Sequence, residues 1–179
     1  MKDNFIEIYK ANISRDGSDK LLEWLEKTDF FRAPASTKFH GAHEGGLVEH
    51  SISVFNRFAC ENPESRAICA LLHDICKVNF YKTEMRNVKV NGTWEQQPYY
   101  VVEDQLPYGH GEKSVYIISG FIRLSRDEAM AINWHMGGFD DRVKGGSYAL
   151  SEAFAKYPMA LNLHIADMQA TYFDEVKQK

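Results

Sequence analysis

The chain has 179 residues, of which 44% are hydrophobic and 26% are charged, values typical of one globular domain with a core of its own. Its formal net charge of −4 gives no strong electrostatic signature of binding to nucleic acid or to an acidic membrane. No apolar run is long enough to span a bilayer, and the first residues lack a signal-peptide core. The odd cysteine count, Cys60, Cys69 and Cys76, indicates free thiols in a reducing compartment. We therefore expect a single domain over residues 1–179, located in the cytoplasm.

The first half of the chain is dominated by helical patterns. Residues 1–16 are weakly patterned and fit either a short helix or a strand. Asn62-Pro63 favours the start of a helix, because proline is well tolerated in a first turn. Apolar residues at helical spacing predict helices over residues 18–28, 47–60 and 63–77.

Residues 79–105 have a different pattern. Val88–Trp94 contains Asn91-Gly92, the pair most typical of a two-residue hairpin turn, and Tyr99–Val102 is a second β-favouring run. We expect a small β-ribbon inserted between helices. Its tyrosines, Tyr81, Tyr99 and Tyr100, are candidates to cover part of a cleft.

Helical patterns resume after the ribbon. Ser125 and Glu128 form a capping box, in which each side chain satisfies an open amide of the other residue. Gly137-Gly138 opens a glycine-rich loop over residues 137–147. We expect helices over residues 110–124, 125–135, 150–157 and 159–175.

An almost wholly apolar stretch, Ala67–Leu72, runs directly into the adjacent pair His73-Asp74. A helix of that composition is expected to be buried on nearly every side, yet an imidazole and a carboxylate are costly to bury without partners. Neighbouring residues on a helix point about 100° apart, so the carboxylate could serve one ion and the histidine another. A buried cation would account for the pair; a hydrogen-bonded histidine at a capped helix end is the alternative.

Further histidines and carboxylates lie in apolar surroundings on other predicted helices. Inward-facing groups of this kind, drawn from several helices, are how helical bundles hold metal ions. His110 is also explained as a loop histidine, and His135 as a cation at a helix C-terminus. If either of them is not a ligand, the site would hold one ion. His164 shares a face with Asp167, and we expect it to be a hydrogen-bond partner in the core rather than a ligand. The candidate metal ligands are His50, His73, Asp74, His110, His135 and Asp167.

The order and local sequence of these residues resemble the HD superfamily of metal-dependent phosphohydrolases, whose signature is His…His-Asp…Asp. Gly45–Ser51, Leu71–Lys77 and Ile165–Met168 carry the resemblance. His110 and His135 match the two intervening histidines of the two-metal branch. The resemblance spans residues 40–170, and the HD domains of three-prime exoribonucleases of Gram-positive bacteria are similar in local sequence. Cys76 stands where that family usually has glycine.

The resemblance implies a mainly α fold, an HD-domain helical bundle with the small β-hairpin as an insertion. One ion would take His50, His73, Asp74 and Asp167, and a second would share Asp74 and take His110 and His135. Mixed imidazole and carboxylate ligands suit Mn, Fe, Co, Ni or Zn better than Mg alone. The implied reaction is hydrolysis of a phosphoester or phosphodiester of a nucleotide or short oligonucleotide by a metal-bound water. The catalytic residues would be Asp74 and Lys77.

Four residues are candidates to contact the substrate phosphate: His43, Lys77, Arg142 and Lys144. Each has a plainer explanation. His43, like His40, lies on a loop before the first ligand and is explained as a surface residue. Lys77 would complement a helix dipole, and Arg142 and Lys144 lie in a charged loop. Two other functions stay open. One is a diiron oxygenase of the same superfamily, and the other is a non-catalytic sensor that binds a nucleotide.

Overall fold

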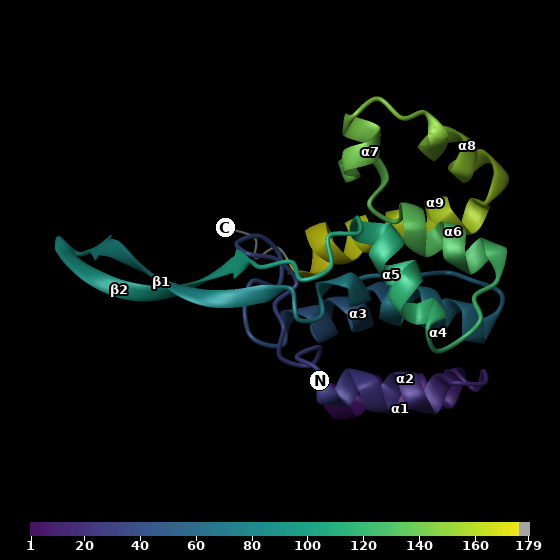
Figure 1. Ribbon diagram of the computed structural model, residues 1–179, viewed down its shortest axis with the longest axis horizontal. Helices are drawn as coiled ribbons and strands as arrows, with labels where there is room; N and C mark the ends of the chain where they lie inside the picture. The colour runs from purple at the N-terminus through teal and green to yellow at the C-terminus, as the bar shows by residue number, and fades with distance from the viewer. Residues whose placement is uncertain (176–179) are drawn as a thin grey trace.

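The computed structural model describes residues 1–175 and shows a mainly helical fold with one antiparallel β-hairpin, which confirms the fold class expected from the sequence (Figure 1). The α-helices are α1 (Lys2–Asn12), α2 (Ser18–Lys27), α3 (Gly46–Arg57), α4 (Pro63–Leu72), α5 (His110–Ser119), α6 (Arg126–Trp134), α7 (Asp141–Lys144), α8 (Ala149–Lys156) and α9 (Pro158–Gln169). Short 3-10 turns, η1 (Ile75–Lys77) and η2 (Gly137–Phe139), follow α4 and α6, and α9 continues into a π-helical turn, η3 (Ala170–Glu175). The hairpin consists of β1 (Tyr81–Val90) and β2 (Thr93–Val102).

Helix α4 lies at the centre of the core. Every side chain from Ala67 to Leu72 is fully buried. The helix packs against α1, α3 and α6, and α6 in turn packs against α5 and α9. Because the last turns of α4 have no solvent-facing side, the residues that follow Leu72, His73 and Asp74, lie inside the protein.

A buried carboxylate fixes α6 against this centre. Glu128 is fully buried and accepts hydrogen bonds from the guanidinium of Arg15 at 2.7 and 3.0 Å and from the hydroxyl of Ser65 at 2.7 Å. It also accepts from the backbone N–H of Ser125, while the Ser125 hydroxyl accepts from the backbone of Glu128, so the predicted capping box is confirmed. Since buried charges persist only when paired and hydrogen-bonded, this network fixes the relative positions of α4 and α6.

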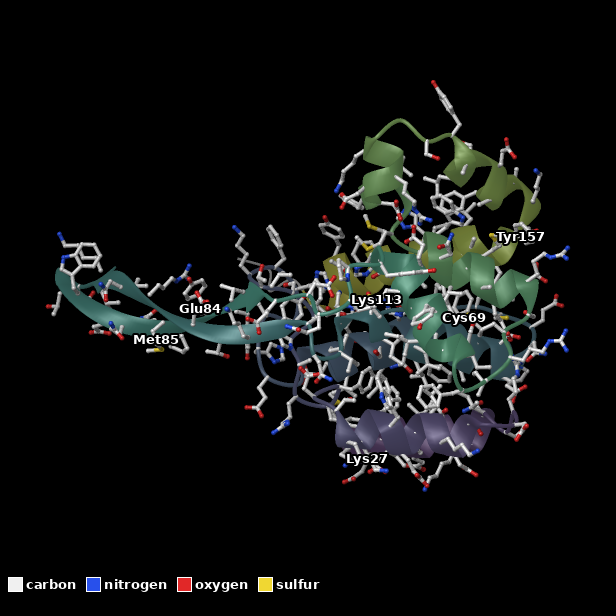
Figure 2. The ribbon with its side chains drawn as sticks, in the orientation of Figure 1. Lys27, Cys69, Glu84, Met85, Lys113 and Tyr157 are labelled. Atoms are coloured by element: carbon white, nitrogen blue, oxygen red, sulfur yellow. The ribbon has the colours of Figure 1, made fainter. Side chains whose placement is uncertain are left out.

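The hairpin projects away from the helices (Figure 1). Val90 pairs with Thr93, and Asn91 and Gly92 form the two-residue turn with φ of 48° and 89°, the left-handed pair that such turns require. Figure 2 shows Glu84 and Met85 out on this arm, distant from the helical body. The tyrosines separate: Tyr81 lies at the base and its hydroxyl donates to the backbone oxygen of Ala35 at 3.3 Å, whereas Tyr99 donates to Glu84 on the arm itself.

Residues 1–16, for which the sequence allows a helix or a strand, contain the helix α1. Two predicted helix ends were wrong. The helix expected to reach Lys77 ends at Leu72, because Asp74 takes φ −101° and ψ 16° and turns the chain into η1. The helix expected over residues 110–124 ends at Ser119.

The later boundaries also differ. The loop over residues 137–147 contains η2 and α7, because the carboxylate of Asp140 accepts from the backbone N–H of Arg142 at 2.8 Å and caps a short helix there. The last helix changes to π-helical geometry after Gln169. Among the helices formed by residues 1–175, none has the length and apolar character needed to cross a membrane.

Candidate metal centre

The structure brings all six candidate ligands together at the centre of the fold. They come from helix interiors and helix ends, so each is held by rigid backbone. His50 is on α3, His73 and Asp74 follow the last residue of α4, His110 is the first residue of α5, His135 follows the last residue of α6, and Asp167 is on α9.

Three of the histidines are held in the same way, with Nδ1 turned to an acceptor on the protein. Nδ1 of His73 lies 2.9 Å from the backbone oxygen of Ala70, and Nδ1 of His135 lies 2.6 Å from that of Ile132. Nδ1 of His50 lies 2.8 Å from a carboxylate oxygen of Glu175. A carbonyl or carboxylate oxygen can only accept, so each Nδ1 carries a hydrogen and donates it.

The opposite ring nitrogens therefore face one another inside the protein. Nε2 of His50 and Nε2 of His73 are 3.2 Å apart, and both rings are buried. Nε2 of His135 is buried and has no hydrogen-bond partner among the described residues. Facing lone pairs are stable only with a cation or a proton between them, because a buried acceptor without a partner carries the full cost of lost hydration.

The distances between these atoms suit shared coordination. Two ligand atoms about 2.1 Å from one metal ion are roughly 3.0 to 3.4 Å apart in octahedral or tetrahedral geometry. Nε2 of His50 is 3.2 Å from Oδ1 of Asp167, and Nε2 of His135 is 3.4 Å from Oδ1 of Asp74. Both distances, like the His50–His73 distance, lie in that range, so these three pairs of donor atoms have the spacing of ligands that share an ion.

Asp74 connects the two halves of the cluster. Its Oδ1 faces His110 at 2.8 Å and His135 at 3.4 Å, and its Oδ2 faces His73 at 3.6 Å and His50 at 3.7 Å. One carboxylate thus faces four histidines, two on each oxygen. That arrangement suits a bridging ligand between two positions.

The same carboxylate is paired with a buried lysine. Nζ of Lys77 lies 2.5 Å from Oδ2 of Asp74, and both residues are less than a tenth exposed. Burial alone would raise the pKa of Asp74, but the charge of Lys77, together with the hydrogen bond from His110, holds that pKa well below its usual range. Asp74 is therefore an anion at neutral pH, as a metal ligand must be.

The surroundings shift the pKa values of three of these histidines in different directions. Burial would lower the pKa of His50, but its hydrogen bonds to Asp167 and Glu175 raise it to about 10. Burial lowers the pKa of His73 to about 3, so that ring stays neutral. For His110, burial is opposed by Cys76 and Asp74, and its pKa rises to about 10. Protons held by His50 and His110 supply charge that divalent cations could supply instead.

Two glycines allow the elements to approach this closely. A Cβ on Gly111 would lie 2.2 Å from the backbone oxygen of Asn133, so the first turn of α5 rests directly on the last turn of α6. This contact brings His110 beside His135, with ring centroids 5.1 Å apart. Gly137 has φ 53°, and a Cβ there would lie 2.4 Å from the ring of His164.

His164 occupies the role expected of it. Its Nδ1 donates to the backbone oxygen of His135 at 2.7 Å. It therefore supports the backbone of a candidate ligand rather than joining the cluster.

Three residues lie beside this centre although the sequence did not identify them as part of it. Glu175 accepts from His50 although the two are 125 positions apart, and no local pattern marks it. The ring of His40, which the sequence places on a surface loop, lies with its centroid 5.1 Å from that of His50. The sulfur of Cys76 lies 3.6 Å from each ring nitrogen of His110. For Cys76, the difference from the glycine usual at this position in the HD sequences that the chain resembles was an available signal.

The candidate substrate residues lie in different surroundings. The side chain of His43 is 56% exposed, and its Nε2 lies 3.3 Å from Glu49. Arg142 pairs with Glu112 and with Asp140, each at 2.7 Å, and its guanidinium lies 3.9 Å from the ring centroid of Trp134. The structure gives these two residues partners of their own. It pairs Lys144, also exposed, with Asp141 at 3.0 Å.

Comparison of the chain with protein-family models, with curated proteins and with solved structures gave no match. The chemistry of the centre therefore rests on its own geometry. Buried histidine, aspartate and cysteine side chains grouped around Asp74 could hold a metal ion. Each group of three presents ligand atoms within 4.8 Å of one another.

Proposed function

We propose that this chain is an HD-type phosphohydrolase that depends on one or two divalent transition metal ions. Its substrate would be a phosphoester or phosphodiester of a nucleotide or a short oligonucleotide, the class that the resemblance in sequence implies. The observation that carries the proposal is the orientation of three buried histidines. His50, His73 and His135 each donate through Nδ1 to a fixed acceptor and turn Nε2 toward two aspartates.

The donor set fits divalent transition metals. Imidazole nitrogen combined with carboxylate oxygen suits Mn, Fe, Co, Ni or Zn, with Mg the poorer match. Bound ions would lower the pKa of a water molecule toward neutrality and would neutralise charge on a phosphoryl group. One position would be held by His50, His73, Asp74 and Asp167, and the other by Asp74, His110 and His135.

Asp74 and Lys77 would act together. The ammonium group keeps the Asp74 carboxylate ionised and fixes the direction of Oδ2. Because Lys77 is buried against this carboxylate, its first role would be to position Asp74. Contact with a substrate phosphate would require it to leave that partner.

The partial exposure of two candidate ligands, His110 and Asp167, supports access of a substrate to the cluster from one side. The side chain of His110 is 27% exposed and that of Asp167 is 16% exposed, whereas His50, His73 and His135 are almost fully buried. A phosphate would therefore reach the cluster beside His110 and Asp167. The buried histidines would keep water from the opposite side.

The proposal is tested with purified protein, stripped by a chelator and reloaded separately with Mn, Co, Ni or Mg. We expect turnover of at least one member of a panel of nucleotides, dinucleotides and aryl phosphodiesters. Lys27→Ala is the control, since it removes an exposed charged side chain on α2, outside the cluster and the candidate substrate contacts, and it should retain activity.

Two results would contradict the proposal. The first is tight binding of a nucleotide without turnover in any metal, which would favour a sensor. The second is an iron-loaded protein that is inert toward phosphoesters but gives a mixed-valent signal on exposure to oxygen, which would favour an oxygenase.

A further inference from the structure

A thiol lies beside the position assigned to His110 and His135. Cys76 is in η1, between Asp74 and Lys77, and is 2% exposed. Its backbone N–H donates to the hydroxyl of Ser114 on α5 at 3.2 Å, which fixes the turn against that helix. The sulfur is held 3.6 Å from both ring nitrogens of His110.

An independent observation points to a ligand at the same place. Nε2 of His135 is buried without a hydrogen-bond partner and lies 3.4 Å from Oδ1 of Asp74. The same oxygen is 2.8 Å from Nε2 of His110. Ligand atoms of Asp74, Cys76 and His110 lie within 4.8 Å of one another, so the thiol is close to two of the three donors expected at this position.

We propose that Cys76 is a thiolate ligand of the second metal position, together with Asp74, His110 and His135. This inference rests on the metal site of the proposed function and specifies its chemistry further. On binding, a sulfur–metal bond replaces the S–H bond and the proton passes to water, so neither sulfur nor metal changes oxidation state.

A sulfur donor changes which metals this position holds. Soft thiolate ligands favour Zn, Fe or Co and discriminate against Mg and Mn, which prefer oxygen donors. The other position, with His50, His73, Asp74 and Asp167, has only nitrogen and oxygen donors. The two positions therefore differ in selectivity, and the sulfur-containing one should be the more selective.

The other two cysteines provide controls. Cys69 is fully buried within the helical body, with its sulfur 3.9 Å from that of Met159, and Figure 2 shows it among the core helices. Cys60 is partly exposed in the segment between α3 and α4. Since neither belongs to the groups of potential metal ligands, Cys69→Ser matches Cys76→Ser in burial but should leave the metal site intact.

The test is the near-ultraviolet absorption of the full chain loaded with cobalt(II). Sulfur-to-cobalt charge transfer gives an intense band that imidazole and carboxylate ligands do not give. We expect the band in the wild-type chain and in Cys69→Ser, and its loss in Cys76→Ser and in Cys76→Ala. Loss of a residue that hydrogen-bonds to a metal ligand costs roughly 10- to 100-fold in metal affinity. Loss of the ligand itself in Cys76→Ser should lower the zinc affinity of this position by at least as much, and should leave its manganese affinity unchanged.

The outcomes separate this inference from the proposed function. Two bound cobalt ions without the band, or a band that persists in Cys76→Ser, would overturn the ligand role of Cys76 even if phosphoesters are hydrolysed. A band that depends on Cys76 in a chain without any turnover would support the ligand role and contradict the hydrolase. Cys76→Ala serves as a second variant, because retention of the band in it would be equally contradictory.

Discussion

Metal binding should raise the thermal stability of this chain by a predictable amount. An ion that binds only the folded state adds RT ln(1 + [L]/Kd), which is about 2.7 kcal/mol at 100 times Kd. With roughly 2.1 cal/mol/K of unfolding entropy per residue, the 179 residues give about 0.38 kcal/mol/K. One ion should therefore raise Tm by about 7 °C, and two ions at equal saturation by about 14 °C.

The assay is calorimetry of chelator-treated protein with each metal added back. Asp74→Asn combined with Lys77→Met removes the buried ion pair as a unit, so neither partner remains as an uncompensated buried charge. This double variant should fold and lose the metal-dependent rise in Tm. His43→Ala should keep the full rise, because that side chain is exposed and pairs with Glu49.

An equal metal-dependent rise in Tm in the double variant would refute metal binding at this centre. That result would place the ions elsewhere on the chain. A wild-type protein whose Tm responds to none of the transition metals would refute it as well, because the buried donors would then gain nothing from a cation.

Four further predictions concern particular residues. His135→Ala should leave one ion per chain by elemental analysis, since it removes a donor assigned to the second position alone; two retained ions would count against that assignment. Gly111→Ala should force α5 away from the Asn133 carbonyl, cost about 1 to 3 kcal/mol in urea unfolding and lower the metal content; unchanged metal content would show that the close approach is dispensable. Burial opposes charge on Glu128, but its bonds to Arg15 and to Ser125 lower its pKa, so its stabilisation is present above the unfolded pKa and is lost as pH falls through the folded one. Glu128→Gln should therefore cost about 2 kcal/mol at neutral pH, and the difference from wild type should shrink below roughly pH 4; a pH-independent difference would contradict this. Replacing residues 84–99 of the hairpin by a two-residue turn should leave Tm nearly unchanged, because this arm projects from the helices; a large fall in Tm would show that it packs against something.

Features set by local sequence were predicted well. Asn91-Gly92 specifies the hairpin turn because both residues adopt positive φ readily, and it does so at the expected place. The Ser125 capping box starts α6 because its two bonds lie within four residues. Helix spacing likewise located α2 and α3 within a few residues.

Features set by tertiary contacts were not predictable from such patterns. The apolar run through Leu72 gives no sign that the helix stops there, because the contacts that accompany the turn at Asp74 come from Lys77 and His110. Glu175 reaches His50 only through the fold. The six candidate ligands were identified from their order and their apolar context, but their shared inward direction follows from backbone acceptors such as the oxygen of Ala70, which no sequence pattern displays.

Anomalous diffraction from crystals grown with zinc or cobalt would test the central claim most directly. We predict one ion bounded by His50, His73 and Asp167, and a second against His110 and His135, with Asp74 touching both. Anomalous peaks confined to surface residues, with the Nε2 atoms of His50 and His73 still facing each other and no ion beside them, would contradict it.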